Sequence, residues 1–217
     1  MTRTLALSVA LALSQAKAHE DLAAAHFKGL SVQIVKVDAD AGVQAGKNKD
    51  VNLGAKDILE VKHYEDTPDS GWVLQRVYLR FKLDGLKAAD FKTAHLAVFG
   101  NLGDGTQPVE VDVAILADKD DGWTEPKLTW NTQPPLADAK PVGALSFTYG
   151  DTPTRATEGR WYVTKDLGEA LKAKLARKCG MASLLLTTKI KEEACLFTKE
   201  HKKGAELSPR LVLVKGK

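Results

Sequence analysis

Short segments in which apolar and polar side chains alternate occupy most of this chain. In residues 75–83, Val77, Leu79 and Phe81 recur at every second position with Arg, Tyr and Lys between them, and residues 108–116 repeat the pattern. A period of two is the spacing of an extended strand, because successive side chains point to opposite faces of a sheet. The pattern therefore predicts antiparallel strands with one buried and one solvated face.

Further segments of this kind raise the prediction to about ten strands, separated by turns rich in Gly, Asp, Asn and Pro. Residues 166–178 differ, because Leu and Ala recur there at helical spacing, with Thr164 or Asp166 placed to cap the helix. The chain is predicted to be an all-β sandwich or barrel with one short helix between late strands. The predicted strands cover residues 31–37, 57–64, 75–83, 94–100, 108–116, 143–149, 160–164, 181–188, 194–200 and 209–214.

The start of the chain has the layout of a secretory signal peptide. A basic residue precedes an apolar run from Leu5 to Leu13, and small residues stand just before His19, where cleavage is expected. The apolar run is too short to span a bilayer as a helix. The predicted organisation is a signal peptide at 1–18, a lead-in segment at 19–30 and one β-sandwich domain at 31–217 of a secreted protein with no transmembrane segment.

The charge of the chain excludes one class of partner. The 217 residues include 31 Lys and Arg and 28 Asp and Glu, and loss of the predicted signal peptide leaves the chain almost neutral. A protein that binds duplexes normally has a strong basic excess, so no nucleic acid is expected as a partner. Residues 38–125 have an acidic excess and residues 165–217 a basic one. Ordinary solvated faces explain this separation, and a basic patch for an acidic polymer is the alternative.

The chain has two cysteines, Cys179 and Cys195. An exported protein with one pair fits a single disulfide, and a pair alone lacks the ligand count of a structural zinc site. Simple hairpin register places Cys195 opposite a residue near 187, which argues against the bond. Strands of a two-sheet fold need not pair in that way, so the sequence leaves the disulfide open.

A set of motifs stands in a characteristic order along the chain: AGVQAGKNKDVNLGAKDILEVK, RVYLRFKLDGL, AHLAVFG, WTEPKLTWNTQP, WYVTKDLGEAL, ASLLLTT, FTKE and PRLVLV. In this order they resemble the DNRLRE domain, also classed as carbohydrate-binding module family 96, over roughly residues 31–214. The resemblance implies a jelly-roll-like β-sandwich and a non-catalytic role in exported proteins. It also implies an acidic algal polysaccharide, such as alginate, as the best-known ligand class.

Individual positions match the pattern of that family. The matching residues are Asp40, Asn52, Gly54, Arg76, Leu79, Phe81 and Glu200. Two positions depart from it, because Lys82 stands where the family usually has Asp, and Gly42 stands where an aromatic residue is common. A ligand or ion role at these two positions is therefore in doubt in this chain.

The segment GWTEPKLTWNTQPP, residues 122–135, must form an irregular loop, because its prolines exclude helix and central strand. Leu128 and Trp130 are two residues apart and can enter one core, with Trp123 closing an end of the sandwich as a plug. Thr124 and Glu125 can hold the loop to nearby backbone. The loop is interpreted as a structural fastening, and a stacking platform for a sugar ring is the alternative.

The polar face of the strand at 75–83 offers the main ligand candidates. Arg76, Tyr78 and Arg80 form a row along the sheet, which Lys62 joins if the strands pair, and Trp72 is a further aromatic candidate. Guanidinium groups bind carboxylates bidentately, and a uronic-acid polymer offers a carboxylate at every ring. The alternative is a solvated strand face whose charges prevent edge pairing.

No cofactor is required by these motifs, and a structural calcium ion is one candidate. Asp38, Asp40, Asp50 and Asn52 offer hard oxygen ligands from one loop and one strand end, as calcium prefers. Alternate residues of a strand also share one solvated side, so the spacing alone does not assign an ion.

Catalytic signatures are absent from the sequence. It contains no G-x-S-x-G, no H-E-x-x-H and no phosphate-binding glycine loop, so no enzyme activity is expected. A remote alternative is a copper-dependent polysaccharide monooxygenase, in which His19 would become the amino terminus. The other histidines available as partners are His26, His63, His95 and His201.

The sequence therefore predicts a secreted, non-catalytic carbohydrate-binding module for an acidic polysaccharide. A structural or adhesive protein of the cell envelope is the alternative, in which the same sandwich serves only as a packing unit. The sequence does not fix the oligomeric state.

Overall fold

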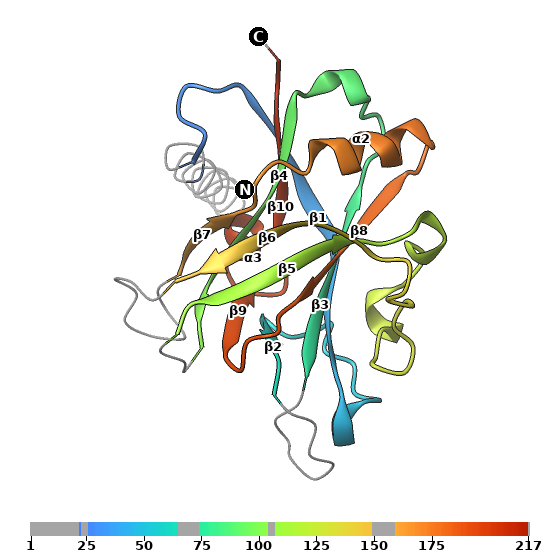
Figure 1. The fold of residues 1–217 in the computed structure, drawn as a ribbon, viewed down its shortest axis with the longest axis vertical. Coiled ribbons are helices and arrows are strands. Elements are labelled where there is room, and N and C mark those ends of the chain that lie inside the picture. The colour runs from blue at the N-terminus through green and yellow to red at the C-terminus, as the bar shows by residue number, and fades with distance from the viewer. Residues whose placement is uncertain (1–21, 23–25, 65–73, 104–106, 149–158, 217) are drawn as a thin grey trace, which may run out of the picture.

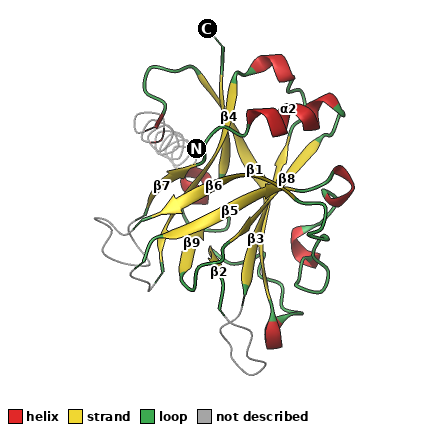
Figure 2. Ribbon diagram, viewed as in Figure 1, coloured by secondary structure: helices red, strands yellow, loops and turns green. Residues whose placement is uncertain are grey.

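The computed structural model describes residues 22, 26–64, 74–103, 107–148 and 159–216. Strands dominate these residues, and helical segments lie at the periphery (Figures 1 and 2). The strands are β1 (Val32–Gln44), β2 (Ile58–Lys62), β3 (Gln75–Lys82), β4 (Thr93–Leu102), β5 (Val109–Ile115), β6 (Lys140–Phe147), β7 (Arg160–Val163), β8 (Met181–Thr187), β9 (Glu193–Phe197) and β10 (Arg210–Val214). All ten predicted strands are confirmed, and the predicted all-β class with them.

The strands form one antiparallel sheet that closes on itself through β1. The sheet order is β1-β10-β4-β9-β2-β3-β8-β5-β6, with β7 paired to β4 and an additional pairing between β1 and β3. Residues 32–36 of β1 pair with β10, and residues 39–44 pair with β3. The register shifts between Val37 and Ala39, so Asp38 is the extra residue of a bulge. A bulge bends and twists its strand, which lets β1 serve both sides of the barrel-like sandwich.

The predicted alternation of β3 and β5 is confirmed in the main core. Val77, Leu79 and Phe81 of β3 are fully buried, and so are Val109 and Val111 of β5. These side chains belong to one apolar cluster, which also includes residues from β2, β4, β8, β9 and β10. Burial of this apolar surface is the main term that stabilises the closed sheet.

A second apolar cluster covers the opposite face of β3, which the alternation predicts to be solvated. Its buried members are Ala39, Ala41, Val43, Tyr78, Leu116, Trp123, Leu128 and Leu185. The cover is the connection between β5 and β6, which lies beside β3 and β8 in yellow-green in Figure 1. The prediction of one solvated face is therefore wrong for β3, because an irregular loop replaces water there.

Helical structure is limited in the described residues. The predicted helix at 166–178 is α2 (Gly168–Ala176), and Asp166 accepts a hydrogen bond from the Gly168 amide, at 2.7 Å, as an N-terminal cap would. Lys178, at a φ of 59°, ends it in the left-handed region. The remaining segments are α3 (Gly204–Leu207) and the 3₁₀ segments η1 (Gly46–Asn48), η2 (Ala88–Asp90), η3 (Asp118–Asp120) and η4 (Glu125–Lys127).

A buried ion pair fixes α2 to the sheet. Lys174 is 1% exposed, and its Nζ lies 2.5 Å from Asp121 Oδ2 and 2.9 Å from Asp118 Oδ1. The other oxygen of Asp121 accepts a hydrogen bond from the Ser183 amide of β8, at 2.9 Å. One lysine thus joins the helix, the β5–β6 connection and a central strand.

The two cysteines are not joined by a disulfide in the structure. Cys179 follows α2, whereas Cys195 lies on β9, which pairs with β2 and β4 rather than with β8. The Cys195 thiol lies 3.6 Å from Glu193 Oε1, as donor to that carboxylate. The disulfide that the sequence left open is therefore absent, because the two residues stand on strands and loops that do not adjoin.

Some sequence predictions concern residues outside the described ranges. The predicted signal peptide at 1–18, His19 and Trp72 belong to this group. Among the described residues, no helix has the length and apolar character needed to cross a membrane.

The ion pair of Lys174 leads to a stability prediction. Replacing Lys174 with Ala leaves the buried Asp121 carboxylate without its counter-ion, and removal of one partner of a buried pair typically costs about 3–5 kcal/mol. Urea unfolding should therefore show a loss of that size in the free energy of unfolding. Lys172→Ala on the same helix removes a more exposed lysine and should cost about 0.5 kcal/mol. Equal losses in the two variants would contradict the assigned role of Lys174.

Candidate functional site

The predicted ligand row on β3 lies beneath the loop of residues 122–139. Tyr78 is completely buried, and its hydroxyl donates a hydrogen bond to Gln133 Oε1, at 2.9 Å. Arg76 donates to the same oxygen, at 3.0 Å, and its guanidinium lies 4.3 Å from the centroid of the Trp130 ring. Tyr78 therefore cannot stack on a sugar, and Arg76 already has an aromatic and an amide partner.

Arg80, the third member of the row, also has partners within the protein. Its Nη2 lies 2.7 Å from Asp38 Oδ2, its Nη1 donates to the Trp123 carbonyl, and its guanidinium stacks over the Trp123 ring. Asp38 also pairs with Lys82, at 2.6 Å. Partial burial opposes ionisation of Asp38, but the hydrogen bonds from Lys82 and Arg80 outweigh it and hold the pKa of this carboxyl below its ordinary value. These contacts join the predicted row to the covering loop and to β1.

The loop itself is a structural cover, as the sequence interpretation had it. Leu128 and Trp130 enter one apolar cluster, as expected. Trp123 is 8% exposed and donates from Nε1 to Ser183 Oγ, at 3.0 Å. It lies on the outer face of β3, against Tyr78, and not at an end of the sandwich. The position expected for Trp123 is therefore wrong, because the loop crosses the sheet face instead of closing the barrel.

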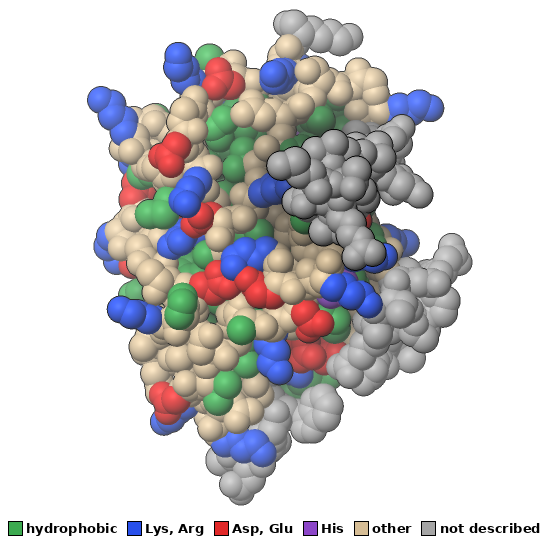
Figure 3. Space-filling model, turned by 180° about the vertical axis from the view of Figure 1, so that it is seen from behind, with side chains coloured by type: hydrophobic (Ala, Val, Ile, Leu, Met, Phe, Trp, Pro, Cys, Tyr) green, Lys and Arg blue, Asp and Glu red, His purple; other side chains and the backbone are tan. Residues whose placement is uncertain are grey.

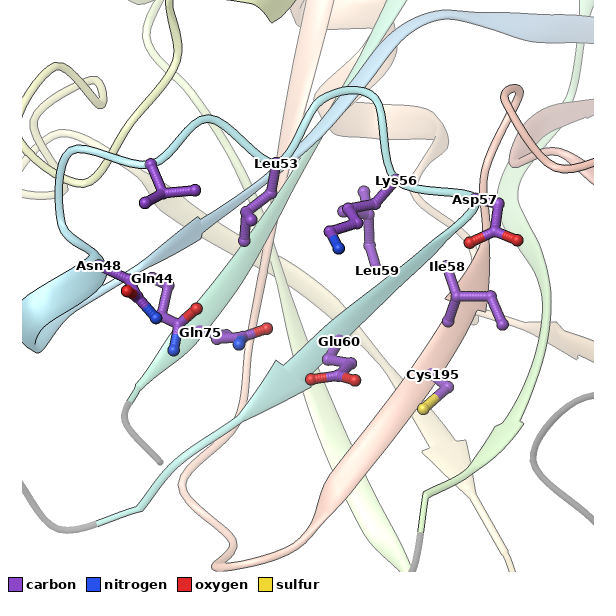
Figure 4. Close-up of a pocket in the computed structure, with 11 residues that line it drawn as sticks. Gln44, Asn48, Leu53, Lys56, Asp57, Ile58, Leu59, Glu60, Gln75 and Cys195 are labelled. Atoms are coloured by element: carbon purple, nitrogen blue, oxygen red, sulfur yellow. The ribbon is translucent and has the colours of Figure 1, made fainter. Parts of the chain in front are cut away.

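A groove lined by polar and apolar side chains lies beside this covered face, between β2 and the segment of residues 45–57 (Figure 4). It has a volume of about 570 Å³, within the usual range of ligand sites. In the view of Figure 4, three amide side chains stand at one end of the groove and Asp57 at the other, with Glu60 between them. The lining residues are Gln44, Asn48, Val51, Leu53, Lys56, Asp57, Ile58, Leu59, Glu60, Gln75 and Cys195.

Lys62, which the sequence placed in the ligand row, lies below the groove instead. Its side chain is 5% exposed, and its Nζ lies 2.7 Å from Glu60 Oε2 and 3.5 Å from Glu193 Oε2. Lys62 therefore neutralises Glu60 of the groove and the buried Glu193 next to it. Glu60, with 30% of its side chain exposed, remains accessible to a ligand.

The segment over the groove has exposed lysines. Lys47, Lys49 and Lys56 are all exposed, and Val51 is one of the few large apolar side chains at the surface, at 46% exposure. Asp50 is also exposed and accepts a hydrogen bond from Asn131, at 2.6 Å. The groove thus combines an amide and carboxylate floor with a basic, partly apolar rim.

Asn52 joins this rim to the covering loop. Its Nδ2 donates to the carbonyls of Glu125 and Leu128, at 2.6 and 2.8 Å, and its Oδ1 accepts from the Gly54 amide, at 3.1 Å. A Cβ on Gly54 would lie 2.6 Å from Glu125 Cγ, so glycine is required for this close approach. The N-x-G turn therefore positions both the groove rim and Glu125.

The predicted calcium ligands do not come together. Asp38 is held by Arg80 and Lys82, Asp50 contacts Asn131, and both polar atoms of Asn52 bind backbone groups. These contacts attach loops and strands to one another, and the four predicted side chains do not form a common set of metal ligands. Only Asp40 lies in a carboxylate cluster.

That cluster consists of Asp40, Glu125 and Glu200, one oxygen of each lying within 4.8 Å of the others. Asp40 is completely buried, and its Oδ2 accepts a hydrogen bond from the Lys199 amide, at 2.9 Å. The Lys199 side chain lies 2.8 Å from Glu125 Oε2 and also contacts Glu200. Two of these positions, Asp40 and Glu200, match the family pattern, and Glu125 belongs to its W-T-E core. The family motifs therefore pointed to these three positions. Their contact could not be predicted from sequence, because the three residues are far apart along the chain.

Burial raises the pKa of Asp40 to about 8, and the nearby Glu200 and Glu125 carboxylates add to this effect against the hydrogen bond from the Lys199 amide. The one lysine of this cluster does not supply enough positive charge to balance three ionised carboxylates. The Asp40 carboxyl therefore tends to keep its proton in the folded protein.

The described histidines take other roles. Both ring nitrogens of His95 have partners, the Thr164 carbonyl at 2.9 Å and Thr93 Oγ1 at 3.1 Å. His201 packs on Phe197 and is 8% exposed, and its Nδ1 accepts from the Lys203 amide. No described histidine belongs to a cluster that could hold a metal ion.

The pKa of Asp40 predicts how stability depends on pH. The ordinary pKa is 3.8, so between about pH 4 and pH 8 the folded chain holds a proton that the unfolded chain has lost. The free energy of unfolding should fall as pH rises through this window, by up to about 1.4 kcal/mol per unit, and level off above it. Asp40→Asn cannot ionise, so its stability relative to wild type should rise from pH 5 to pH 8.

Urea unfolding in EDTA at these two pH values measures the difference. Asp84→Asn, at an exposed position, is the control and should follow wild type at both. Parallel pH profiles of wild type and Asp40→Asn would contradict a raised pKa at this site.

Comparison with known proteins adds a family to this geometry. No curated protein matches the chain. The sequence model described as carbohydrate-binding module family 96 matches residues 31–215, which include all strands of the described residues, the groove and the carboxylate cluster. The resemblance noted from the ordered motifs is thereby confirmed, and the chain belongs to carbohydrate-binding module family 96.

Proposed function

We propose that this protein binds an acidic polysaccharide in the groove between β2 and residues 45–57, without catalysing a reaction. The observation that carries the proposal is the groove itself: amides, carboxylates, Lys56 and apolar side chains line one space of about 570 Å³, and the segment beside it bears the exposed Lys47 and Lys49. Membership of a family of carbohydrate-binding modules supports the polymer class and the non-catalytic role.

The floor of the groove suits the hydroxyl groups of a sugar. Gln44, Asn48 and Gln75 offer both amide donors and carbonyl acceptors, while Asp57 and Glu60 offer acceptors only. A sugar ring also has apolar C–H surfaces, and Val51 and other aliphatic residues of the lining provide an apolar contact for them. This mixture of a few convergent polar groups with apolar surface is typical of small-molecule sites.

The rim favours a polymer with negative charge. Lys47, Lys49 and Lys56 are exposed along one short segment, and Asp50 is the acid between them in sequence. On the face shown in Figure 3, acidic and basic side chains are interspersed and neither covers a continuous area. The local group of lysines therefore supports the preference for an acidic ligand better than the basic excess of residues 165–217 does.

A second groove, between α2 and residues 115–118 and 137–142, is less suited to sugars. Its volume is about 720 Å³, but Ala, Pro and Val make up much of its lining. Three of its four charged side chains are in ion pairs, Asp118 with Arg177 and Asp138 with Lys119. Few polar groups are left there to select a hydroxylated ligand.

We also propose that the protein is secreted. The support is the signal-peptide layout of its first 18 residues, together with a family of modules that bind polysaccharides. The structural or adhesive role remains as the outcome to expect if no polysaccharide binds.

The rim lysines can be tested by affinity electrophoresis through gels that contain alginate, a neutral glucan or no polymer. Wild type should be retarded only by alginate. The triple variant Lys47→Gln, Lys49→Gln, Lys56→Gln should bind about 10–100-fold more weakly, because three exposed ion pairs contribute roughly 0.5–1 kcal/mol each.

The matched control removes the same charge at the other end of the molecule. Lys28, Lys165 and Lys215 are exposed and lie outside both the groove lining and the segment of residues 45–57. Their triple Gln variant has the same net charge as the rim variant and should bind like wild type. Asn48→Ala, which changes the floor without changing charge, should also weaken binding. Equal weakening in both lysine variants would show that net charge, and not the position of the rim lysines, determines binding. A wild-type protein that alginate does not retard would overturn the proposal.

A further inference from the structure

Three acidic side chains converge from segments that are far apart in the sequence. Asp40 lies on β1, Glu125 begins η4, and Glu200 follows β9. One oxygen of each lies within 4.8 Å of the others. Oxygens that bind one calcium ion at 2.3–2.6 Å are separated by up to about 5 Å, so this spacing is compatible with a shared ion.

The buried end of the cluster has an unsatisfied oxygen. Asp40 is 0% exposed, and its Oδ1 has no hydrogen-bond partner among the described residues. Burying an oxygen without a partner is unfavourable, and without an ion the Asp40 carboxyl keeps its proton. A cation that displaces this proton supplies the missing partner, because buried charges in proteins are normally paired or bound to a metal. The orphaned oxygen is thus an observation independent of the acidic cluster, and it points to a missing cation.

Lys199 meets this need only in part. Its Nζ contacts Glu125 and Glu200, while Asp40 receives only its backbone amide. One ammonium group can balance only one of the three carboxylates, so ionisation of all three requires a further cation. The Lys199 side chain is 32% exposed, so it can turn into solvent when another cation arrives.

We propose that Asp40, Glu125 and Glu200 bind a divalent cation of the calcium type. The carboxylates supply hard oxygen ligands, and their negative charge attracts a doubly charged cation in place of the Lys199 ammonium group. Glu125 and Glu200 are 17% and 25% exposed, which opens the site to solvent for entry and for water ligands. Calcium suits this site better than magnesium, because magnesium demands a nearly ideal octahedron of ligands.

The site would also stabilise the groove rim. Asn52 donates to the Glu125 carbonyl, and Gly54 lies against the Glu125 side chain. A cation on Glu125 therefore holds, through Asn52, the same segment that bears Lys56. The ion site and the groove are adjacent but separate, since no cluster residue lines the groove.

The test is calorimetric titration of the full chain with CaCl₂ after chelator treatment, with no polysaccharide present, so that failure of the proposed function does not affect the result. Wild type should show one saturable site with a dissociation constant of about 10⁻⁵–10⁻³ M, and MgCl₂ should bind at least tenfold more weakly. The melting temperature should be several degrees higher in 10 mM CaCl₂ than in EDTA.

Two variants and a control define the donors. Glu200→Gln should weaken calcium binding at least tenfold, whereas Glu110→Gln, which removes an exposed carboxylate from β5, should leave it unchanged. Lys199→Met removes the competing ammonium group and should tighten calcium binding. If neither wild type nor Lys199→Met shows saturable heat, or if the two glutamate variants behave alike, the proposal is wrong.

Discussion

The attachment of the 122–139 loop to the outer face of β3 is the constraint on which the rest of the structure depends. Arg80 is central to it, because one guanidinium binds Asp38, the Trp123 carbonyl and the Trp123 ring. Asp38 is also the bulged residue of β1, two positions after Lys36, the last residue that pairs with β10 before the strand pairs with β3. The same ion pair therefore stabilises the closure of the sheet and the cover over it. It can do so because partial burial protects it from the screening that weakens surface pairs.

The cover in turn determines where function can lie. Because the loop covers Tyr78 and the side chains beside it on β3, the accessible polar surface lies at the edge of the loop. There Asn52 binds the backbone of Glu125 and Leu128. This contact places the lysine-bearing rim over β2 and brings Glu125 to Asp40 and Glu200. The groove and the carboxylate cluster are consequences of one loop attachment, which explains why these two features of different chemistry adjoin.

The sequence predicted the strands much better than the sites, for a physical reason. Strand alternation is local, so Val77, Leu79 and Phe81 could be assigned to the core from their spacing alone. Alternation also placed Arg76, Tyr78 and Arg80 on a polar face, but it carries no information about a distant loop that covers that face. Long amphipathic side chains are easily misjudged in this way, because their polar tips bind partners while their stems and rings are buried.

The carboxylate cluster is a feature that local sequence patterns could not predict. Asp40 and Asn52 were singled out together as ion ligands because they are near in sequence, yet Asn52 is a backbone fastener and the partners of Asp40 are Glu125 and Glu200. Three-dimensional proximity here depends on the closing of the sheet and on the glycine that lets Glu125 approach. The ordered family motifs include Asp40, Glu125 and Glu200, but only the fold shows that these three residues lie close together. An acidic position that matches a family pattern but has no local partner is therefore best interpreted as one member of a cluster whose other members lie elsewhere in the chain.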